Sequence, residues 1–175
     1  MFLISFPTII IYLAKGNMES YSFEDKLNQI IGEGINDPQK FKDIDPKLLI
    51  IFLEKKLKKN PQDLEGWLIL SRTCVMSGHY QKADKYYHTA LQLFPTNENI
   101  LLEISLLKKN TNQTKSAKNY LYKLKNLYPQ NIIAREMLIE IFMNNSLRNE
   151  ATEEFNQLRI IKKKDEEYIK NIRRK

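Results

Sequence analysis

The feature that most constrains this chain is a spacing of 34 residues along its sequence. Two sets of residues recur at that interval, the prolines Pro61, Pro95 and Pro129 and the alanines Ala83, Ala117 and Ala151. A proline ends a helix because it has no backbone N–H to donate. Equal repeats of this length indicate pairs of antiparallel helices that cannot bury their apolar faces alone and therefore stack on one another. The period predicts a stacked helical binding scaffold rather than an enzyme.

Composition agrees with an all-α fold. The 175 residues are 42% hydrophobic, which is enough for a core in one elongated domain. Five Gly and six Pro are too few for a turn-rich β protein. The single Cys74 excludes an internal disulfide and a C-x-x-C motif for redox chemistry or haem attachment. The histidines His79 and His88 lie nine residues apart, and we expect them on the surface or in a groove, with no metal site and no cofactor.

The first complete repeat, residues 64–97, resembles the tetratricopeptide repeat (TPR). The matching positions are, in chain order, Trp67, Leu70, Gly78, Tyr80, Ala83, Tyr87, Ala90, Leu91 and Pro95. The small alanines let the two helices approach closely, and the glycine suits a turn with positive φ. The resemblance implies an all-α fold, a right-handed TPR superhelix of antiparallel helix pairs.

Two further repeats follow at the same interval. The second, residues 98–131, has lost the turn glycine and offers Asn110, Asn112 and Gln113 instead, and Asn tolerates positive φ better than most residues. The third, residues 132–160, places Arg135 where Trp67 stood and bulky Ile139 at a position occupied by serine in the other repeats. These changes predict looser or rotated packing in the third repeat.

The flanking segments differ from the repeats. Asp45 supplies an N-cap and Pro46 a first-turn residue for a lead-in helix through about residue 58, so we expect the TPR domain to span residues 46–160. Residues 16–45 are rich in Gly, Asn and Asp and are interpreted as a linker. In residues 161–175 the apolar Ile161, Tyr168 and Ile172 share one helical face amid charge, which predicts a basic helix that caps the open end of the solenoid.

The formal charge of +7 is concentrated in the tail. Residues 159–175 hold eight Lys or Arg against three acidic residues, so the repeats are close to neutral. This distribution argues against nucleic-acid binding by the repeats and leaves the tail as the one plausible contact for RNA or anionic lipid.

The first fourteen residues are apolar or uncharged, and the first charged side chain is that of Lys15. Fourteen helical residues span about 21 Å, less than the membrane's hydrocarbon core of about 30 Å. No basic stretch precedes the apolar run, so a signal peptide is a poor fit. We interpret residues 1–15 as the remnant of a membrane anchor, with a buried or interfacial helix as the alternative.

Stacked helix pairs are expected to bind a ligand on the inner wall of their superhelix, which is formed by the first helix of each repeat. If Leu64, Glu98 and Ile132 open the repeats, the peptide-binding candidates are Leu68, Arg72, Val75, Met76, Leu102, Leu106, Lys109, Ile133, Glu136, Glu140 and Met143. An apolar strip with flexible Met and flanking charges suits an amphipathic helix or an extended peptide. About half of these residues are expected to line a groove and the others to pack against a neighbouring helix.

Two other kinds of site are absent from the sequence. TPR domains that grip a C-terminal carboxylate are similar to one another in a set of Lys, Asn and Arg positions, where this chain has Leu68, Arg72, Glu103, Ile133 and Met137. There is also no Gly-rich phosphate loop, no nucleophile with an evident base and no carboxylate pair whose surroundings suggest tuned acidity, so no catalysis is predicted.

The segment of residues 53–72, LEKKLKKNPQDLEGWLILSR, goes beyond a generic repeat. It resembles the lead-in and first repeat of the CcmI (also CycH) family of bacterial cytochrome c maturation proteins, and the apolar run with Pro7, Tyr12 and Gly16 resembles the end of that family's second membrane helix. Related repeat subunits of nitrite reductase maturation share the Trp-containing segment. The family's first membrane helix and cytoplasmic loop have no counterpart here.

The resemblance implies a non-enzymatic assembly factor. It would be anchored in the bacterial inner membrane, and its periplasmic repeats would hold apocytochrome c, chiefly by the C-terminal helix, and present it to haem lyase subunits. The alternative is a general TPR scaffold in another bacterial envelope complex.

Overall fold

The computed structural model describes Asp25, Gln29 and residues 45–173, with side chains described as far as Lys164. Seven helices lie between residues 45 and 173, and none of the described residues belongs to a strand. The predicted all-α fold is therefore confirmed. The chain divides into two compact units, Met1–Gly66 and Trp67–Lys175. The apolar segment of residues 1–15 and almost all of the expected linker lie outside the described residues.

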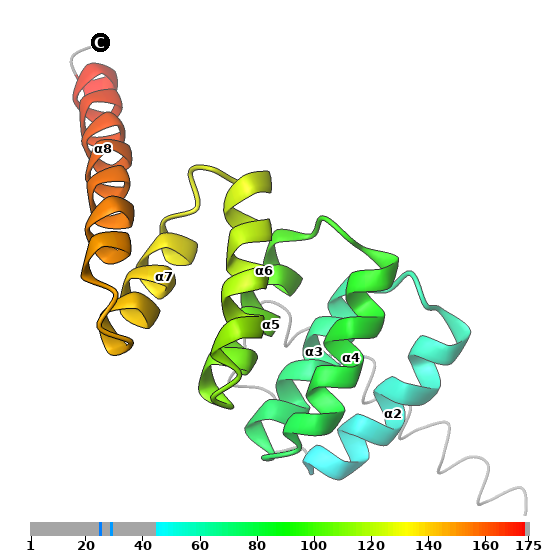
Figure 1. Ribbon diagram of the computed structural model, residues 1–175. Coiled ribbons are helices and arrows are strands. Elements are labelled where there is room, and N and C mark those ends of the chain that lie inside the picture. Colours follow the sequence, from blue (N-terminus) through cyan, green and yellow to red (C-terminus); the bar gives the residue numbers. More distant parts are fainter. Residues whose placement is uncertain (1–24, 26–28, 30–44, 174–175) are drawn as a thin grey trace, which may run out of the picture. The chain divides into compact units, whose positions relative to one another are not determined.

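In the first unit, the lead-in helix α2 spans Pro46–Lys59 (Figure 1). It begins as expected, because the Asp45 carboxylate accepts a hydrogen bond from the Lys47 backbone N–H at 2.9 Å and proline occupies the first turn. Its apolar face is buried through Leu49, Ile50, Leu53 and Leu57. These buried residues thus have the spacing that an amphipathic helix requires.

The end of the first unit explains the Glu-Gly-Trp sequence of residues 65–67. The Asp63 carboxylate accepts from the Gly66 N–H at 2.8 Å and lies 3.0 Å from the Lys56 ammonium. A Cβ on Gly66 would lie 2.9 Å from that carboxyl carbon and 3.0 Å from a Leu57 methyl. Glycine is therefore required by close approach, because any side chain would displace the cap of the following helix.

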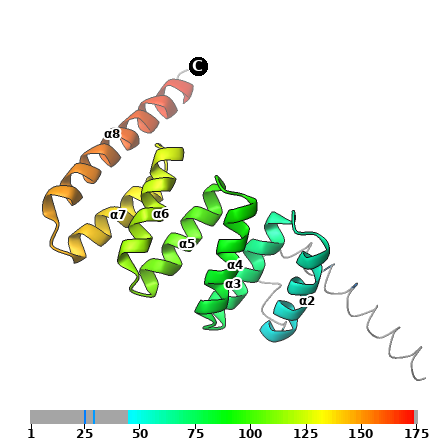
Figure 2. The same ribbon diagram turned by 45° about the vertical axis from the view of Figure 1, so that its right-hand side comes forward.

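The second unit consists of helices that contact one another in chain order. They are α3 (Leu64–Met76, of which Trp67 onward belongs to this unit), α4 (Tyr80–Leu93), α5 (Glu98–Asn110), α6 (Thr114–Leu127), α7 (Ile132–Asn144) and α8 (Arg148–Arg173). The pairs α4–α5, α5–α6, α6–α7 and α7–α8 are in contact, and successive helices run in opposite directions (Figures 1 and 2). The odd-numbered helices are the first, or A, helices of the repeats, and the even-numbered ones from α4 are the second, or B, helices.

The core is continuous from α5 to α8. It joins Leu101 of α5, Ala117, Leu121 and Leu124 of α6, several residues of α7 and Ala151 of α8 in one buried cluster. The repeated alanines are 3% exposed or less, as close helix packing requires. Cys74 and the serines Ser71 and Ser105 are also fully buried, and both hydroxyls donate to the carbonyl four residues earlier.

One position in each repeat keeps its place but changes its chemistry. Trp67 packs against Tyr86, with ring centroids 6.3 Å apart, and the equivalent Leu101 lies in the core beside Tyr120. In the third repeat the equivalent pair is Arg135 and Glu154, whose Nη1 and Oε2 atoms lie 2.7 Å apart with both side chains buried. At this position a buried ion pair replaces the aromatic pair, and looser or rotated packing of the third repeat stays a prediction. Lys125 of α6 also pairs with Glu154 and ties three helices together.

The three turns inside the repeats share one backbone conformation. Gly78, Asn112 and Ser146, each 34 residues apart, have φ values of +74°, +59° and +60°. The expectation that Asn would replace the turn glycine is confirmed for Asn112. Ser146 adopts the same conformation at a steric cost that glycine would not have.

The substitution Ser146→Gly should therefore stabilise the protein, by about 1 kcal/mol. The matched change Gly78→Ala should destabilise it by a similar amount, although a Cβ there meets no atom within 4 Å. Urea denaturation followed by circular dichroism measures both. Loss of stability in Ser146→Gly would show that the serine makes a compensating interaction.

Helix α8 does not end where the third repeat was expected to end. It runs without a break from Arg148 to Arg173, so the repeat and the expected capping helix are one helix. Ile161 is buried, and the Lys162 ammonium lies 3.0 Å from Glu136 of α7, so this part of α8 continues along α7. The side chains of Tyr168 and Ile172 lie outside the described ones.

Candidate functional site

The predicted peptide-binding residues all come from the A helices α3, α5 and α7. Seven are exposed: Arg72, Met76, Leu106, Ile133, Glu136, Glu140 and Met143. Val75, Leu102 and Lys109 are partly buried. Leu68 is only 1% exposed and belongs to the core, so its side chain is not available to a ligand. We call the other ten residues the A-helix wall.

Ion pairs join neighbouring A helices across the wall. Arg72 of α3 donates through Nε to both oxygens of Glu103 on α5 at 3.0 Å and also through Nη2. Lys109 of α5 pairs with Glu140 of α7. Both pairs link residues 31 positions apart, three fewer than the repeat. The side chains therefore cross from one A helix to the next on the same face.

Leu106 lies between the two ion pairs. It is one turn from Glu103 and one turn from Lys109 along α5, and its side chain is 44% exposed. Its counterparts one repeat away on either side are Arg72 and Glu140. The centre of the wall is thus an apolar position bordered by charges that already have partners.

Glu103 also connects the wall to the interior. Its Oε2 atom accepts a hydrogen bond from the Tyr87 hydroxyl of α4 at 2.8 Å, and Tyr87 is 2% exposed. Burial, followed by the nearby Glu103 carboxylate, raises the pKa of Tyr87 far above its usual value near 10. The phenol therefore remains protonated, and a hydrogen-bond donor, at neutral pH.

Sequence reasoning did not include Glu103 among the binding candidates. Glu103 was considered only as a position at which the chain departs from the TPR domains that bind a C-terminal carboxylate. A search for opposite charges about one repeat apart would have found it, because such residues lie on neighbouring parallel A helices. The same search would have paired Lys109 with Glu140.

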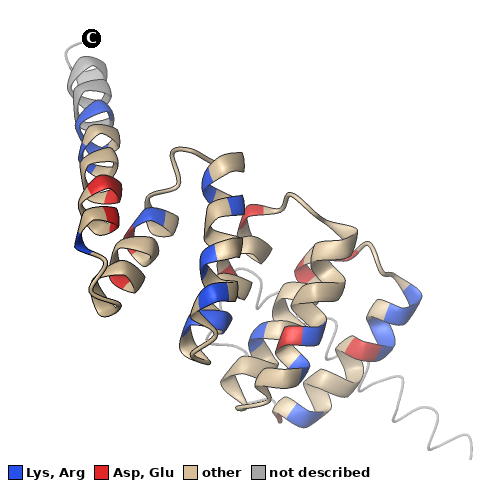
Figure 3. Ribbon diagram, in the orientation of Figure 1, with Lys and Arg blue, Asp and Glu red and all other residues tan. Residues whose placement is uncertain are grey.

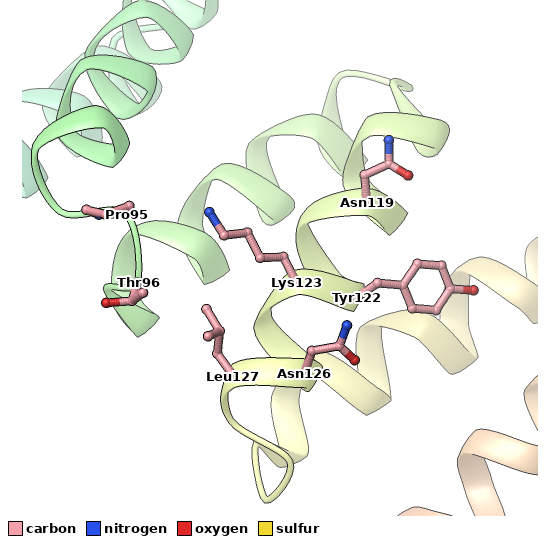
Figure 4. Close-up of a pocket in the computed structure, with 7 residues that line it drawn as sticks. All are labelled: Pro95, Thr96, Asn119, Tyr122, Lys123, Asn126 and Leu127. Atoms are coloured by element: carbon pink, nitrogen blue, oxygen red, sulfur yellow. The ribbon is translucent and has the colours of Figure 1, made fainter.

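A shallow pocket of about 540 Å³ lies away from the wall. It is formed by the turn between α4 and α5 and by α6, and Figure 4 shows the residues that line it: Pro95, Thr96, Asn119, Tyr122, Lys123, Asn126 and Leu127. All seven are exposed, so the pocket has no desolvated polar group that would fix a ligand.

Removing Glu103 should leave the buried Tyr87 hydroxyl without its acceptor. We expect Glu103→Leu to lower the free energy of unfolding by about 2 kcal/mol. Glu103→Gln keeps an acceptor oxygen, so its cost should be clearly smaller. Chemical denaturation of both variants tests this, and equal losses would mean that the charge of Glu103, rather than its hydrogen bond, stabilises the repeat pair.

The described residues offer neither a metal site nor a membrane span. No group of three or more His, Cys, Asp or Glu among them is placed to hold a metal ion. His88 instead contacts Tyr120, with its Nε2 atom 2.9 Å from the hydroxyl. No helix in this part of the chain combines the length and the apolar character needed to cross a bilayer.

Comparisons with known proteins agree with this architecture. The family profile described as "Cytochrome c-type biogenesis protein H TPR domain" matches residues 25–168. A comparison with curated proteins gives no match.

Solved structures share the fold at low sequence identity. A crystal structure of MamA has a TM-score of 0.68 and 18% identity over 87% of this chain and 96% of that one. Another MamA crystal structure has a TM-score of 0.66 and 19% identity over 92% of this chain and 94% of that one. A tetratricopeptide repeat protein from Parabacteroides merdae has a TM-score of 0.64 and 18% identity, covering 77% of this chain and 51% of that one. The likeness shows that the fold is of the TPR type, typically a non-catalytic scaffold for proteins.

Proposed function

We propose that the A-helix wall binds apocytochrome c, because the chain belongs to the family of the cytochrome c-type biogenesis protein H TPR domain. The ligand would be the C-terminal helix of apocytochrome c, which the repeats hold and present to the haem ligation complex. Family membership supports a role in cytochrome c biogenesis, and the TPR fold supports protein binding without catalysis. The single observation that carries the choice of surface is that α3, α5 and α7 each carry exposed apolar side chains on the wall.

The chemistry of the wall favours a helical ligand with one apolar face. Met76, Leu106, Ile133 and Met143 are all at least 44% exposed, and an amphipathic helix would remove them from water. Methionine side chains adapt to irregular partners, which suits a chaperone that holds unfolded polypeptide. The charged residues of the wall border these apolar residues, and each forms an ion pair within the protein.

We also propose where this binding takes place. The family's role supports a periplasmic location for the repeats, and we take residues 1–15 as an anchor in the inner membrane and haem lyase subunits as neighbours. Protease protection of the tagged repeat region in spheroplasts tests the location. Digestion only after the inner membrane is broken would contradict it.

The substitution Leu106→Asp should weaken binding of an apocytochrome c C-terminal peptide by about tenfold or more, because it places a charge in the apolar contact. The matched control is Leu127→Asp, since Leu127 is 42% exposed on the B helix α6. Isothermal titration with each variant measures the affinities, and circular dichroism checks that helicity is unchanged.

Two results would contradict the proposal. Equal losses in both leucine variants would move the site away from the wall. No saturable binding of the peptide by the wild-type chain would leave the general TPR scaffold as the better function. In that case the genes beside this one, if they encode no haem lyase, would support the same conclusion.

Binding should depend little on salt. Because Arg72, Lys109 and their partners are paired within the wall, we expect the peptide's Kd to change by less than about threefold between about 50 and 500 mM NaCl. Titrations at several salt concentrations measure the slope. A steep loss of affinity would show that the ion pairs open to bind charges of the ligand.

A further inference from the structure

The outer face of helix α8 repeats a surface that is buried elsewhere in the second unit. Five residues at helical spacing form it, and we call them the α8 outer face: Arg148, Thr152, Phe155, Arg159 and Lys163. All five are exposed, and Phe155 at its centre is 54% exposed. No hydrogen bond or ion pair involves the side chains of Phe155, Arg159 or Lys163 within the part of the chain that the structure describes. The face is therefore unoccupied by the described residues.

The equivalent residues of α4 contact the next repeat. Tyr87, at the position of Phe155, is buried and donates to Glu103 of α5. Asp84, at the position of Thr152, lies 2.7 Å from the Lys108 ammonium of α5. This face of a B helix therefore receives the following A helix.

The equivalent residues of α6 do the same with different side chains. Leu121, at the position of Phe155, is fully buried in the cluster with α7. The ammonium of Lys118 lies 5.8 Å from the ring centre of Phe142 on α7. Lys125, at the position of Arg159, pairs with Glu154 of the next repeat. On both helices the face thus has a buried centre and a charged residue that pairs with the next repeat, and on α6, as on α8, the charged residues are cations.

The charge of the α8 outer face selects its partner. Arg148, Arg159 and Lys163 surround Phe155, while Glu150 and Glu153 lie on other sides of the helix. Among the residues of α8 that Figure 3 colours, the acidic ones lie in its early turns, and basic ones lie at its start and further along. A partner that buries the phenylalanine must therefore bring carboxylates to the cations.

A second copy of this chain does not meet that requirement through its helix α2. The exposed apolar residues of α2 are Leu48 and Ile51. Lysines accompany them at 47, 55, 56, 58 and 59, against the single acidic residue Glu54. Stacking of α2 on the α8 outer face would bring two basic surfaces together.

We propose that the α8 outer face is a second docking site, separate from the A-helix wall, for an acidic amphipathic helix of another protein. The partner helix occupies the place that the A helix of a fourth repeat would take. Its apolar residues cover Phe155, and its carboxylates pair with Arg148, Arg159 and Lys163. The site extends the stack with a helix from a different chain.

A pair of synthetic peptides tests the proposal with the full chain. Each has about 18 residues, enough for a marginal helix, with leucines along one face; glutamates flank the leucines in one and lysines in the other. By fluorescence polarisation we expect saturable binding of the glutamate peptide, at least about tenfold tighter than the lysine peptide. Phe155→Asp should weaken it by about tenfold or more.

Three variants provide the controls. Ile160→Asp changes a residue of α8 that is 47% exposed but off the face, so it should leave binding unchanged. In the background of Leu106→Asp, which impairs the wall, Phe155→Asp should still weaken binding of the glutamate peptide, which separates this site from the wall. The triple variant R148E/R159E/K163E should reverse the preference in favour of the lysine peptide.

Several outcomes would overturn the proposal. They are no saturable binding at about 1 mM peptide, equal affinity for both peptides, or equal losses in Phe155→Asp and Ile160→Asp. If phosphatidylglycerol vesicles or poly(U) RNA displace the glutamate peptide and bind Phe155→Asp as tightly as the wild type, the face is a polyanion surface instead.

Discussion

The structure depends on one constraint, which is that each helix pair buries its apolar side only against the next pair. Leu121 illustrates it, because its burial requires α7 as well as α5. Interactions of this nearest-neighbour kind make a stack whose stability grows with each repeat. Two features of its surface follow. The A helices lie side by side and can bind one ligand together. The last B helix presents a face that no later helix among the described residues covers.

The repeats keep positions rather than residues. The site of Trp67 and Tyr86 holds an aromatic pair in one repeat and the buried ions Arg135 and Glu154 in another. Such an exchange is tolerated because Lys125 and the Pro129 carbonyl contribute further contacts to the same ions. The turns follow the same rule, since glycine, asparagine and serine all adopt positive φ at one position. What recurs at each step of the stack is the place of the contact and the backbone conformation of the turn.

Much of the fold could be predicted from the sequence because its signals are local. Asp45 and Pro46 begin a helix, and the prolines at 34-residue intervals punctuate the repeats. The N-caps carry the same signal, because Asp63, Asn97 and Asn131 recur at this interval and each accepts a backbone N–H of the following helix. The binding candidates were harder to predict, because helical spacing alone does not tell Leu68, which is buried, from Leu106, which is exposed.

The period, the all-α composition and the chemistry of the turns were determined by the sequence itself, since each depends on residues close together in the chain. Only the tertiary structure decided which charges are already satisfied and which faces remain open. Arg72 pairs with Glu103 from the next repeat, and no helix among the described residues covers Phe155 as its counterparts Tyr87 and Leu121 are covered. Contacts between residues some thirty positions apart exist only after the pairs have stacked, and they determine which surfaces are left for other proteins.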